Sequence, residues 1–293
     1  MRSFAFGGSD VLKALKLSHA AFETSRPAGG RAKKHCRPAR RSLSAFGGAA
    51  SLALLAISLA CGGNATPPPA APAGPSVDPA TAGTVIATVK FEGTPPAPAM
   101  ITITGDPKCA SEQGANQRPD ESLVVGENQA LQNVFVYVKD GLGSFSFPVP
   151  PEPVMLDQDK CRYTPRVLGV RVGQPLQVRN SDPLLHNVRS NAVINQAFNK
   201  STPLEGVSFT HTFATKEVMV PFKCDVHGWM SAYVGVLDHP YFATTGADGR
   251  VAIGNLPPGT YTIAAWHEQL GTKTQQVTIG ARESKDVSFA FAR

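Results

Sequence analysis

The sequence contains none of the short motifs that mark the common hydrolases and nucleotide-binding enzymes. It has no HExxH motif, no glycine-rich phosphate loop, no Ser-His-Asp arrangement and no pair of carboxylates at catalytic spacing. Charged residues are sparse, at 17% of 293 residues, and no stretch shows sustained helical periodicity. A hydrophobic content of 42% excludes a collagen-like or fully disordered chain and is too low for a multi-pass membrane protein.

The excess of positive charge is confined to the N-terminal end of the chain. The formal net charge is +6, but residues 1–60 hold 10 Lys and Arg against 2 Asp and Glu. The remaining 18 Lys and Arg face 20 Asp and Glu, so residues 61–293 carry a net charge of −2. Because this part also lacks a basic stripe, nothing indicates a nucleic-acid partner.

The N-terminal segment has the layout of a secretory signal. A cationic block at 31–41 precedes an apolar run that ends at Cys61, and its most apolar part, 49–60, is short for a membrane span. The run Ser58-Leu59-Ala60-Cys61 resembles a bacterial lipobox, which implies cleavage before Cys61 and a lipid anchor on that residue. We therefore expect residues 1–61 to be a leader and the protein to lie on the periplasmic side of a bacterial envelope. Ordinary secretion and an uncleaved anchor are the alternatives.

Residues 62–83 are predicted to be a Pro/Ala-rich linker. Six prolines lie between Pro67 and Pro79, and few apolar side chains are available to form a core. Such a composition gives a stiff tether. The linker would hold the folded part away from the membrane surface.

After the linker the pattern is that of β-strands throughout. Short runs rich in Val, Phe and Thr are separated by Gly, Pro, Asn or Asp, which is typical of a β-sandwich. The predicted strands are residues 84–91, 131–139, 166–172, 175–180, 207–214, 217–224 and 231–237. Residues 92–160 precede the most informative strands without a clear assignment and could extend the same sandwich.

A second, smaller β-unit is predicted from residue 238 onward. Residues 246–266 contain an Asp-Gly turn, a strand, a Pro-Pro-Gly turn and the alternating strand TYTIAAW, and strands at 272–279 and 285–291 follow. The segment resembles the carboxypeptidase-regulatory-like, transthyretin-type β-sandwich, which implies a structural or adhesive role. His267 and Glu268 are expected in a solvated turn, with an interface or a metal site as the alternatives.

One segment carries an array of metal-binding side chains. Cys224, His227 and Met230 form a CxxHxxM array at the end of a predicted strand, and His186 lies 38 residues before Cys224. A thiolate, two imidazoles and a thioether are the donor set of blue copper sites, because soft sulfur together with imidazole favours copper. The competing interpretation is that Cys224 and Met230 are ordinary core residues and the histidines surface residues.

With these residues the chain resembles a cupredoxin, and its short Cys-to-Met spacing is most similar to that of the amicyanin group. The resemblance implies one type 1 copper site with His186, Cys224 and His227 as equatorial ligands and Met230 as the axial ligand. It also implies that Asn187 ties the two ligand loops together. His227 would reach the surface within an apolar patch that includes Trp229, and electrons would enter there.

The remaining cysteines predict a disulfide. Cys36 lies in the leader, Cys61 is the lipidation candidate and Cys224 is the ligand candidate, which leaves Cys109 and Cys161. In an oxidising compartment these two are expected to pair. The alternative is that both are buried free thiols.

Together these features predict an all-β protein, with a cupredoxin-like Greek-key β-sandwich at 84–237 followed by a small second β-sandwich at 238–293. The predicted function is transfer of single electrons between envelope redox proteins through one copper ion, not catalysis. A copper-buffering lipoprotein, a cupredoxin that has lost its metal and a metal-free surface adhesion or carbohydrate-binding protein are the alternatives. Copper enzymes such as nitrite reductase need a second copper site, for which the chain lacks further histidine clusters.

Overall fold

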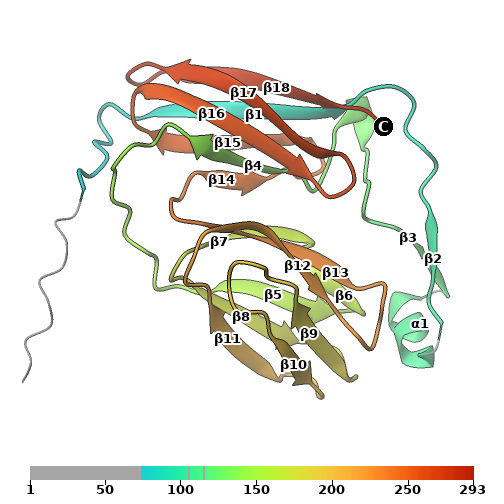
Figure 1. The fold of residues 1–293 in the computed structure, drawn as a ribbon. Coiled ribbons are helices and arrows are strands. Elements are labelled where there is room, and N and C mark those ends of the chain that lie inside the picture. Colours follow the sequence, from blue (N-terminus) through green and yellow to red (C-terminus); the bar gives the residue numbers. More distant parts are fainter. Residues whose placement is uncertain (1–73, 105, 115) are drawn as a thin grey trace, which may run out of the picture. The chain divides into compact units, whose positions relative to one another are not determined.

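The computed structural model describes residues 74–104, 106–114 and 116–293 (Figure 1). The predicted leader, the lipidation candidate Cys61 and the first part of the predicted linker lie outside these described residues. The end of the predicted linker lies against the folded body, because Pro75 O accepts a hydrogen bond from Ser146 N at 3.2 Å and Thr81 O accepts one from Arg282 N at 3.1 Å.

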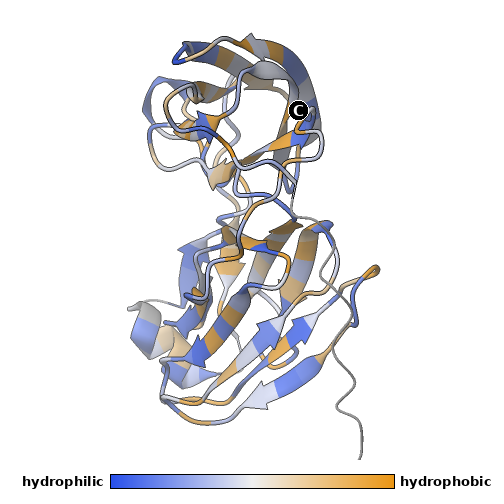
Figure 2. Cartoon of the chain, turned by 90° about the vertical axis from the view of Figure 1, so that its left-hand side faces the viewer, coloured by the Kyte–Doolittle hydropathy of each residue, from blue (hydrophilic) through white to orange (hydrophobic). Residues whose placement is uncertain are grey.

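Strands dominate the described residues, which confirms the all-β fold class. Along β1 (Gly83–Phe91) buried residues alternate with more exposed ones, as expected for a strand with one face in a core. Figure 2 shows such alternation of hydrophobic and hydrophilic residues along many strands. The described helical segments are α1 (Pro107–Gln113) and the short 3₁₀ segment η1 (Glu127–Gln129). In this part of the chain no helix has the length and apolar character needed to cross a membrane.

The first sandwich carries the predicted metal ligands and consists of a five-stranded and a four-stranded sheet. The five-stranded sheet runs in the order β10 (Asn199–Thr202), β9 (His186–Ser190), β12 (Glu217–Lys223), β13 (Ser231–Leu237), β7 (Val167–Arg171). The four-stranded sheet runs in the order β11 (Ser208–Thr212), β8 (Pro175–Asn180), β5 (Val154–Asp159), β6 (Arg162–Thr164). A contiguous apolar core lies between the two sheets and includes Leu156, Val178, Phe222 and Val234.

The second sandwich consists of a three-stranded and a four-stranded sheet. The three-stranded sheet runs in the order β15 (Arg250–Leu256), β1, β18 (Ser284–Phe291), and the other in the order β14 (Phe242–Thr244), β4 (Phe135–Asp140), β16 (Gly259–His267), β17 (Gly271–Ile279). Its core includes Val85, Val136, Ile263 and Phe291. A separate two-stranded ribbon is formed by β2 (Met100–Thr102) and β3 (Gln117–Pro119).

The two sandwiches are not consecutive in the sequence. β1 pairs with β15 and β18, and β4 pairs with β14 and β16, so both strands belong to the second sandwich. The expectation that residues 84–91 and 131–139 extend the ligand-bearing sandwich is therefore wrong. Apolar alternation reports which face of a strand is buried, but it does not report which strand lies beside it.

Side chains of both sandwiches meet in a third, smaller apolar cluster. It contains Phe135 and Ala264 from the second sandwich and Val167 and Leu237 from the first sandwich. A Cβ on Gly235 would lie 2.5 Å from a ring atom of Phe135, so only glycine permits this close approach.

A buried ion pair also joins the two sandwiches. Arg166 Nε lies 2.5 Å from Glu268 Oε1, and Arg166 Nη2 lies 2.9 Å from Glu268 Oε2. The exposed fractions of the two side chains are 9% and 8%, and His267 is 1% exposed. The expectation of a solvated turn at His267 and Glu268 is wrong, because the end of β16 packs against the first sandwich instead.

Candidate metal centre

Three of the predicted ligands converge on one point. His186 Nδ1 lies 2.8 Å from His227 Nδ1, and Cys224 Sγ lies 4.0 Å from His227 Nδ1. The ligand atoms of these three residues all lie within 4.8 Å of one another. The exposed fractions are 0% for His186 and 2% for both Cys224 and His227, so the cluster lies inside the first sandwich.

The connection between two paired strands presents Cys224 and His227. Cys224 follows β12 directly and Met230 precedes β13 directly, and these strands pair antiparallel with Lys223 opposite Ser231. Within the connection, Met230 N donates to His227 O at 2.9 Å and Cys224 N donates to Met230 O at 3.4 Å. Met230 is fully buried in the same apolar core as Cys224. The CxxHxxM array thus spans the short connection between β12 and β13.

His186 comes from a strand that the sequence pattern did not reveal. It is the first residue of β9, which pairs with β10 through Thr202 and with β12 through Lys223 opposite Arg189. Sheet pairing therefore brings residues 186 and 224 to the same end of the sandwich. The short run HNVRS lacks the apolar alternation of the longer strands, which is why it was expected to be a loop.

Asn187 joins the two ligand segments. Its side-chain oxygen accepts a hydrogen bond from Asp225 N, and its Nδ2 donates to Asp225 Oδ2 at 3.0 Å and to Asn199 Oδ1 at 2.6 Å. Main-chain N–H groups of Asn187 and His227 also donate to the Cys224 sulfur, the latter at 3.4 Å. Asn187 therefore links the segment of His186 to the segment of Cys224 and His227.

The electrostatic environment favours a thiolate beside an imidazolium in the metal-free protein. Burial raises the pKa of Cys224, but hydrogen bonds from His186, His227 and the main chain lower it to about 6. Burial lowers the pKa of His186, but hydrogen bonds with Asp182 and Cys224 raise it to about 9. A deprotonated sulfur is the form that binds a metal ion.

Two carboxylates that sequence reasoning missed bind the outer nitrogens of the histidines. Asp182 Oδ2 lies 2.8 Å from His186 Nε2, and Asp106 Oδ2 lies 3.4 Å from His227 Nε2. Asp182 stands in the turn Asn-Ser-Asp-Pro before the first histidine, and Asp106 is the N-cap of α1, with Pro107 following it. The Asp-Pro step and the left-handed Gly114 at the other end of α1 are helix signals that could have located Asp106.

His227 does not reach the surface, in contrast to the expectation from the resemblance. Its ring packs against Trp229, at 5.2 Å between ring centroids, and its Nε2 faces Asp106. Trp229 in turn donates through Nε1 to Cys161 O at 3.1 Å. The segment that precedes the sandwich, which was left without an assignment, covers the imidazole edge.

Cys109 and Cys161 form a disulfide, with both residues fully buried and 52 residues apart in the sequence. Cys224 is a free and buried cysteine. Within the described residues, the disulfide and the one free cysteine are therefore as predicted from the sequence.

The arrangement fits a bound metal ion. A metal about 2 Å from each of two imidazole nitrogens needs those nitrogens to be about 3 Å or more apart, which is close to the observed 2.8 Å. The donor set of two nitrogens and one thiolate sulfur, with a buried methionine in the same β12–β13 connection, matches the preferences of copper. Each outer nitrogen is bound by a carboxylate, as is usual for histidines that bind metals.

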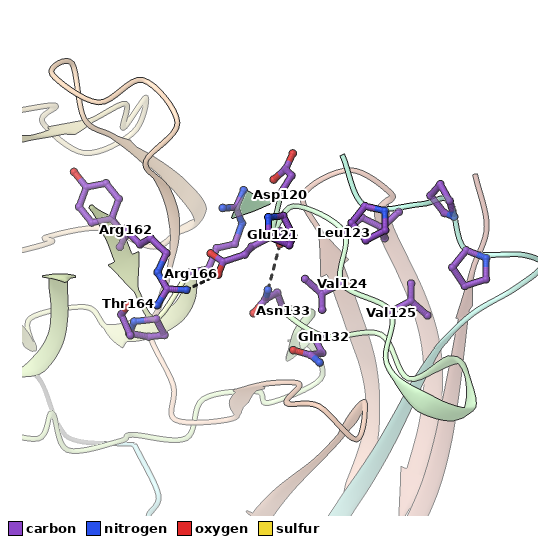
Figure 3. Close-up of a pocket in the computed structure, with 16 residues that line it drawn as sticks. Asp120, Glu121, Leu123, Val124, Val125, Gln132, Asn133, Arg162, Thr164 and Arg166 are labelled. Atoms are coloured by element: carbon purple, nitrogen blue, oxygen red, sulfur yellow. Dashed lines mark hydrogen bonds and ion pairs between the residues drawn. The ribbon is translucent and has the colours of Figure 1, made fainter. Parts of the chain in front are cut away.

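A separate cavity of about 570 Å³ lies beside the first sandwich and is lined by proline, aliphatic, polar and charged residues (Figure 3). Two of its charged groups pair with each other, since Arg162 Nη1 lies 2.8 Å from Glu121 Oε1, while Arg166 pairs with Glu268. Asn133 Nδ2 donates to the main-chain oxygen of Glu121 at 3.4 Å.

Comparison with known protein families gives one match of limited length. The model described as polysaccharide lyase family 4, domain II matches residues 213–287, which include parts of both sandwiches. It is not the carboxypeptidase-regulatory-like family that residues 246–266 resemble. None of the curated proteins compared with the chain matches it.

Solved structures that match the chain in part include copper proteins. A reduced tryptophan-to-tyrosine mutant of amicyanin is 24% identical, with a TM-score of 0.27, over 30% of this chain and 85% of that chain. A purple cupredoxin from Nitrosopumilus maritimus is 31% identical, with a TM-score of 0.22, over 25% and 80%. A copper-containing nitrite reductase from Thermus scotoductus is 20% identical, with a TM-score of 0.27, over 31% and 24%. This chain thus spans about a quarter of the nitrite reductase.

Proposed function

We propose that this chain is a copper protein that carries single electrons, with His186, Cys224 and His227 as the main ligands and Met230 as a weaker fourth ligand. The observation that carries the proposal is the convergence of two imidazole nitrogens and one thiolate sulfur in a buried site. When bound, copper would supply a one-electron Cu(I)/Cu(II) couple.

The role of the chain's own residues is to hold these donors with little freedom to move. Sheet pairing positions His186, and the short β12–β13 connection positions Cys224 and His227. Hydrogen bonds through Asn187 tie the two segments together. Ligands on such rigid elements change position little when charge changes, which favours rapid electron exchange over catalysis.

The burial of the site favours retention of the metal over delivery to another protein. His186, Cys224 and His227 are each at most 2% exposed, so an incoming acceptor could not contact the ligands directly. This supports an electron carrier over a copper-buffering protein.

The cellular setting is part of the same proposal. The leader at 1–61 and the lipidation candidate Cys61 support an envelope protein on the periplasmic side, anchored by lipid. Its partners would then be envelope redox proteins. Cleavage before Cys61 can be tested by the mass of the mature N-terminus.

The central test is copper binding by the purified full chain. Wild-type protein is expected to bind one Cu(II) with an intense thiolate-to-copper absorption band and a reversible reduction potential. Cys224→Ser should lose the band, and His227→Ala should lose tight binding and fast electron exchange. His211→Ala, a change on β11, is the matched control and should behave as wild type. Normal copper affinity and transfer rate in His227→Ala would overturn the proposal.

A second candidate concerns the C-terminal half alone. The match of residues 213–287 to a domain of polysaccharide lyases favours a polysaccharide-binding role for this region, with or without copper. Binding of the metal-free chain to a polysaccharide array is the test. Copper uptake without polysaccharide binding would leave only the first candidate.

A further inference from the structure

In the candidate site, each histidine contacts a carboxylate through Nε2, the ring nitrogen that does not face the other histidine. Their Nδ1 atoms face each other beside Cys224, while His186 Nε2 contacts Asp182 and His227 Nε2 contacts Asp106. A ligand imidazole held at its second nitrogen has a defined ring orientation and stronger donor character. The outer contacts therefore act on both ligands at once.

A single disulfide connects the two carboxylates. The main-chain N–H of Cys161 donates to Asp182 Oδ2 at 2.8 Å, and the main-chain N–H of Cys109 donates to Asp106. Cys109 and Cys161 are bonded to each other. The path from His186 through Asp182 and the disulfide to Asp106 and His227 is continuous.

The two ends of this path are held unequally. Asp182 is 2% exposed and also accepts from Lys160 N at 2.6 Å, while its own N–H donates to Asn180 Oδ1 at 2.9 Å. The Asp106 side chain is 30% exposed and belongs to the short helix α1, which carries Cys109. Asp182 thus has several hydrogen bonds within the sandwich, whereas Asp106 bonds to Lys108 N and Ala110 N of α1, the helix that the disulfide joins to the sandwich.

We propose that Asp106, Asp182 and the Cys109–Cys161 disulfide form one positioning unit that orients both histidine ligands and closes the outer edge of His227. Without the disulfide, Asp106 leaves His227 and the imidazole edge becomes accessible, while Asp182 stays on His186. The effect on copper rests on the proposed function, but the closure of His227 does not.

Closure is tested on the metal-free full chain by the rate at which diethyl pyrocarbonate modifies His227, followed by peptide mass spectrometry. The Cys109→Ser/Cys161→Ser variant should react at His227 about tenfold faster than wild type or more, as expected on loss of a closing contact to a charged group. Asp106→Asn keeps an N-cap residue for α1 but removes the negative charge beside His227 Nε2. In this variant His227 should react at an intermediate rate. His211, which packs against Phe198 and Phe213, is the internal reference.

The outcomes of this first test are decisive in both directions. Faster modification of His227 with an unchanged rate at His211 supports the proposal. Equal His227 rates in wild type and Asp106→Asn overturn it, even where the double serine variant fails to fold. A parallel rise at His211 also overturns it, because it reports general loosening.

The second test concerns copper. The rate of Cu(I) transfer to a chromophoric chelator should rise about tenfold in Cys109→Ser/Cys161→Ser, and the absorption band of the Cu(II) form should shift in Asp106→Asn. Asp106→Glu, which restores the charge, should return the band toward wild type. Copper bound with an unchanged band and exchange rate in every variant overturns the positioning unit. Absence of copper binding in wild type overturns the proposed function instead, and the His227 modification result still stands.

Discussion

The two sandwiches use buried polar groups very differently. The first buries a connected polar network at the end that holds the candidate ligands: Gln158 Nε2 donates to Asn187 O at 3.2 Å, and Asn180 Nδ2 donates to Leu184 O at 2.7 Å. Thr202 Oγ1 donates to Gln158 Oε1 at 2.7 Å and completes the network. The core of the second sandwich is a continuous apolar cluster from Val85 to Phe291.

This difference indicates where the fold serves stability and where it serves chemistry. Buried polar groups are costly unless hydrogen-bonded, so a network of bonded groups around two histidines and a thiolate points to a functional site. In the second sandwich the buried hydrogen-bonded side chains, such as Thr245 and Tyr261, bond to the main chain, and burial of its apolar faces is the main stabilising contribution. The predictions below separate these two contributions, from the largest expected effect to the smallest.

A matched pair of core truncations gives the largest effect. Phe222→Ala in the first sandwich and Phe291→Ala in the second should each lower the free energy of unfolding by about 3–5 kcal/mol, since both side chains are fully buried. Denaturant titration measures this. Phe222 lies two residues before Cys224, so only its variant should also lose copper faster. Equal copper release from both variants would remove the distinction between the sandwiches.

The ion pair between the sandwiches is the next test. Removing one partner in Arg166→Met or Glu268→Leu should cost about 3–5 kcal/mol, because the other charge is left buried and unpaired. The double variant, which removes both charges, should recover most of this loss. Strict additivity of the two single changes in denaturant titration would contradict a direct interaction.

Acid should destabilise the second sandwich and its junction through two buried histidines. Burial lowers the pKa of both His239 and His267 to about 4, below the 6.5 of the unfolded chain. The unfolded state therefore binds more protons between these values, and stability falls as the pH drops from 6.5 toward 4, by about 2–3 kcal/mol for each histidine.

The measurement is the midpoint of thermal unfolding at pH 7 and pH 4.5. His239→Gln and His267→Gln should each shrink the loss at pH 4.5. Hydrogen bonds hold the pKa of the Asp182 and Glu217 carboxyls below the usual range despite burial. The stability that these two carboxylates contribute is therefore lost only below about pH 4. An unchanged acid loss in both variants would show that these histidines are not responsible.

The smallest effect is expected at the fourth ligand candidate. Met230→Leu conserves shape and should change stability by less than about 1.5 kcal/mol. Copper should remain bound while its reduction potential rises, because the fourth ligand tunes that potential. Cyclic voltammetry provides the readout. A potential equal to that of wild type would exclude Met230 from the ligand set.

Much of the fold and of the candidate site could be predicted from the sequence. Strands 175–180 and 231–237 match β8 and β13 at both ends, and the spacing of Cys224, His227 and Met230 corresponds to one connection between paired strands. These predictions succeeded because alternation and short-range spacing are local properties. The strand that begins at His186 was missed, since its pairing with β10 and β12 stabilises a run with little apolar alternation of its own.

The remaining features depend on contacts between distant segments. Asp106 reaches His227 across more than a hundred residues, and β1 finds its partners at the far end of the chain. The burial of His227 likewise depends on α1, which the disulfide connects to the first sandwich.

The amino-acid sequence by itself determined the all-β character, the types of donor atom available and their spacing within one connection, because these follow from residue chemistry and local periodicity. Only the tertiary structure decided which strands share a sheet, that Asp106 and Asp182 hold the two imidazoles, and that the site is closed. Sheet partners and outer contacts are selected by the packing of the whole chain, and no short stretch of sequence contains that information.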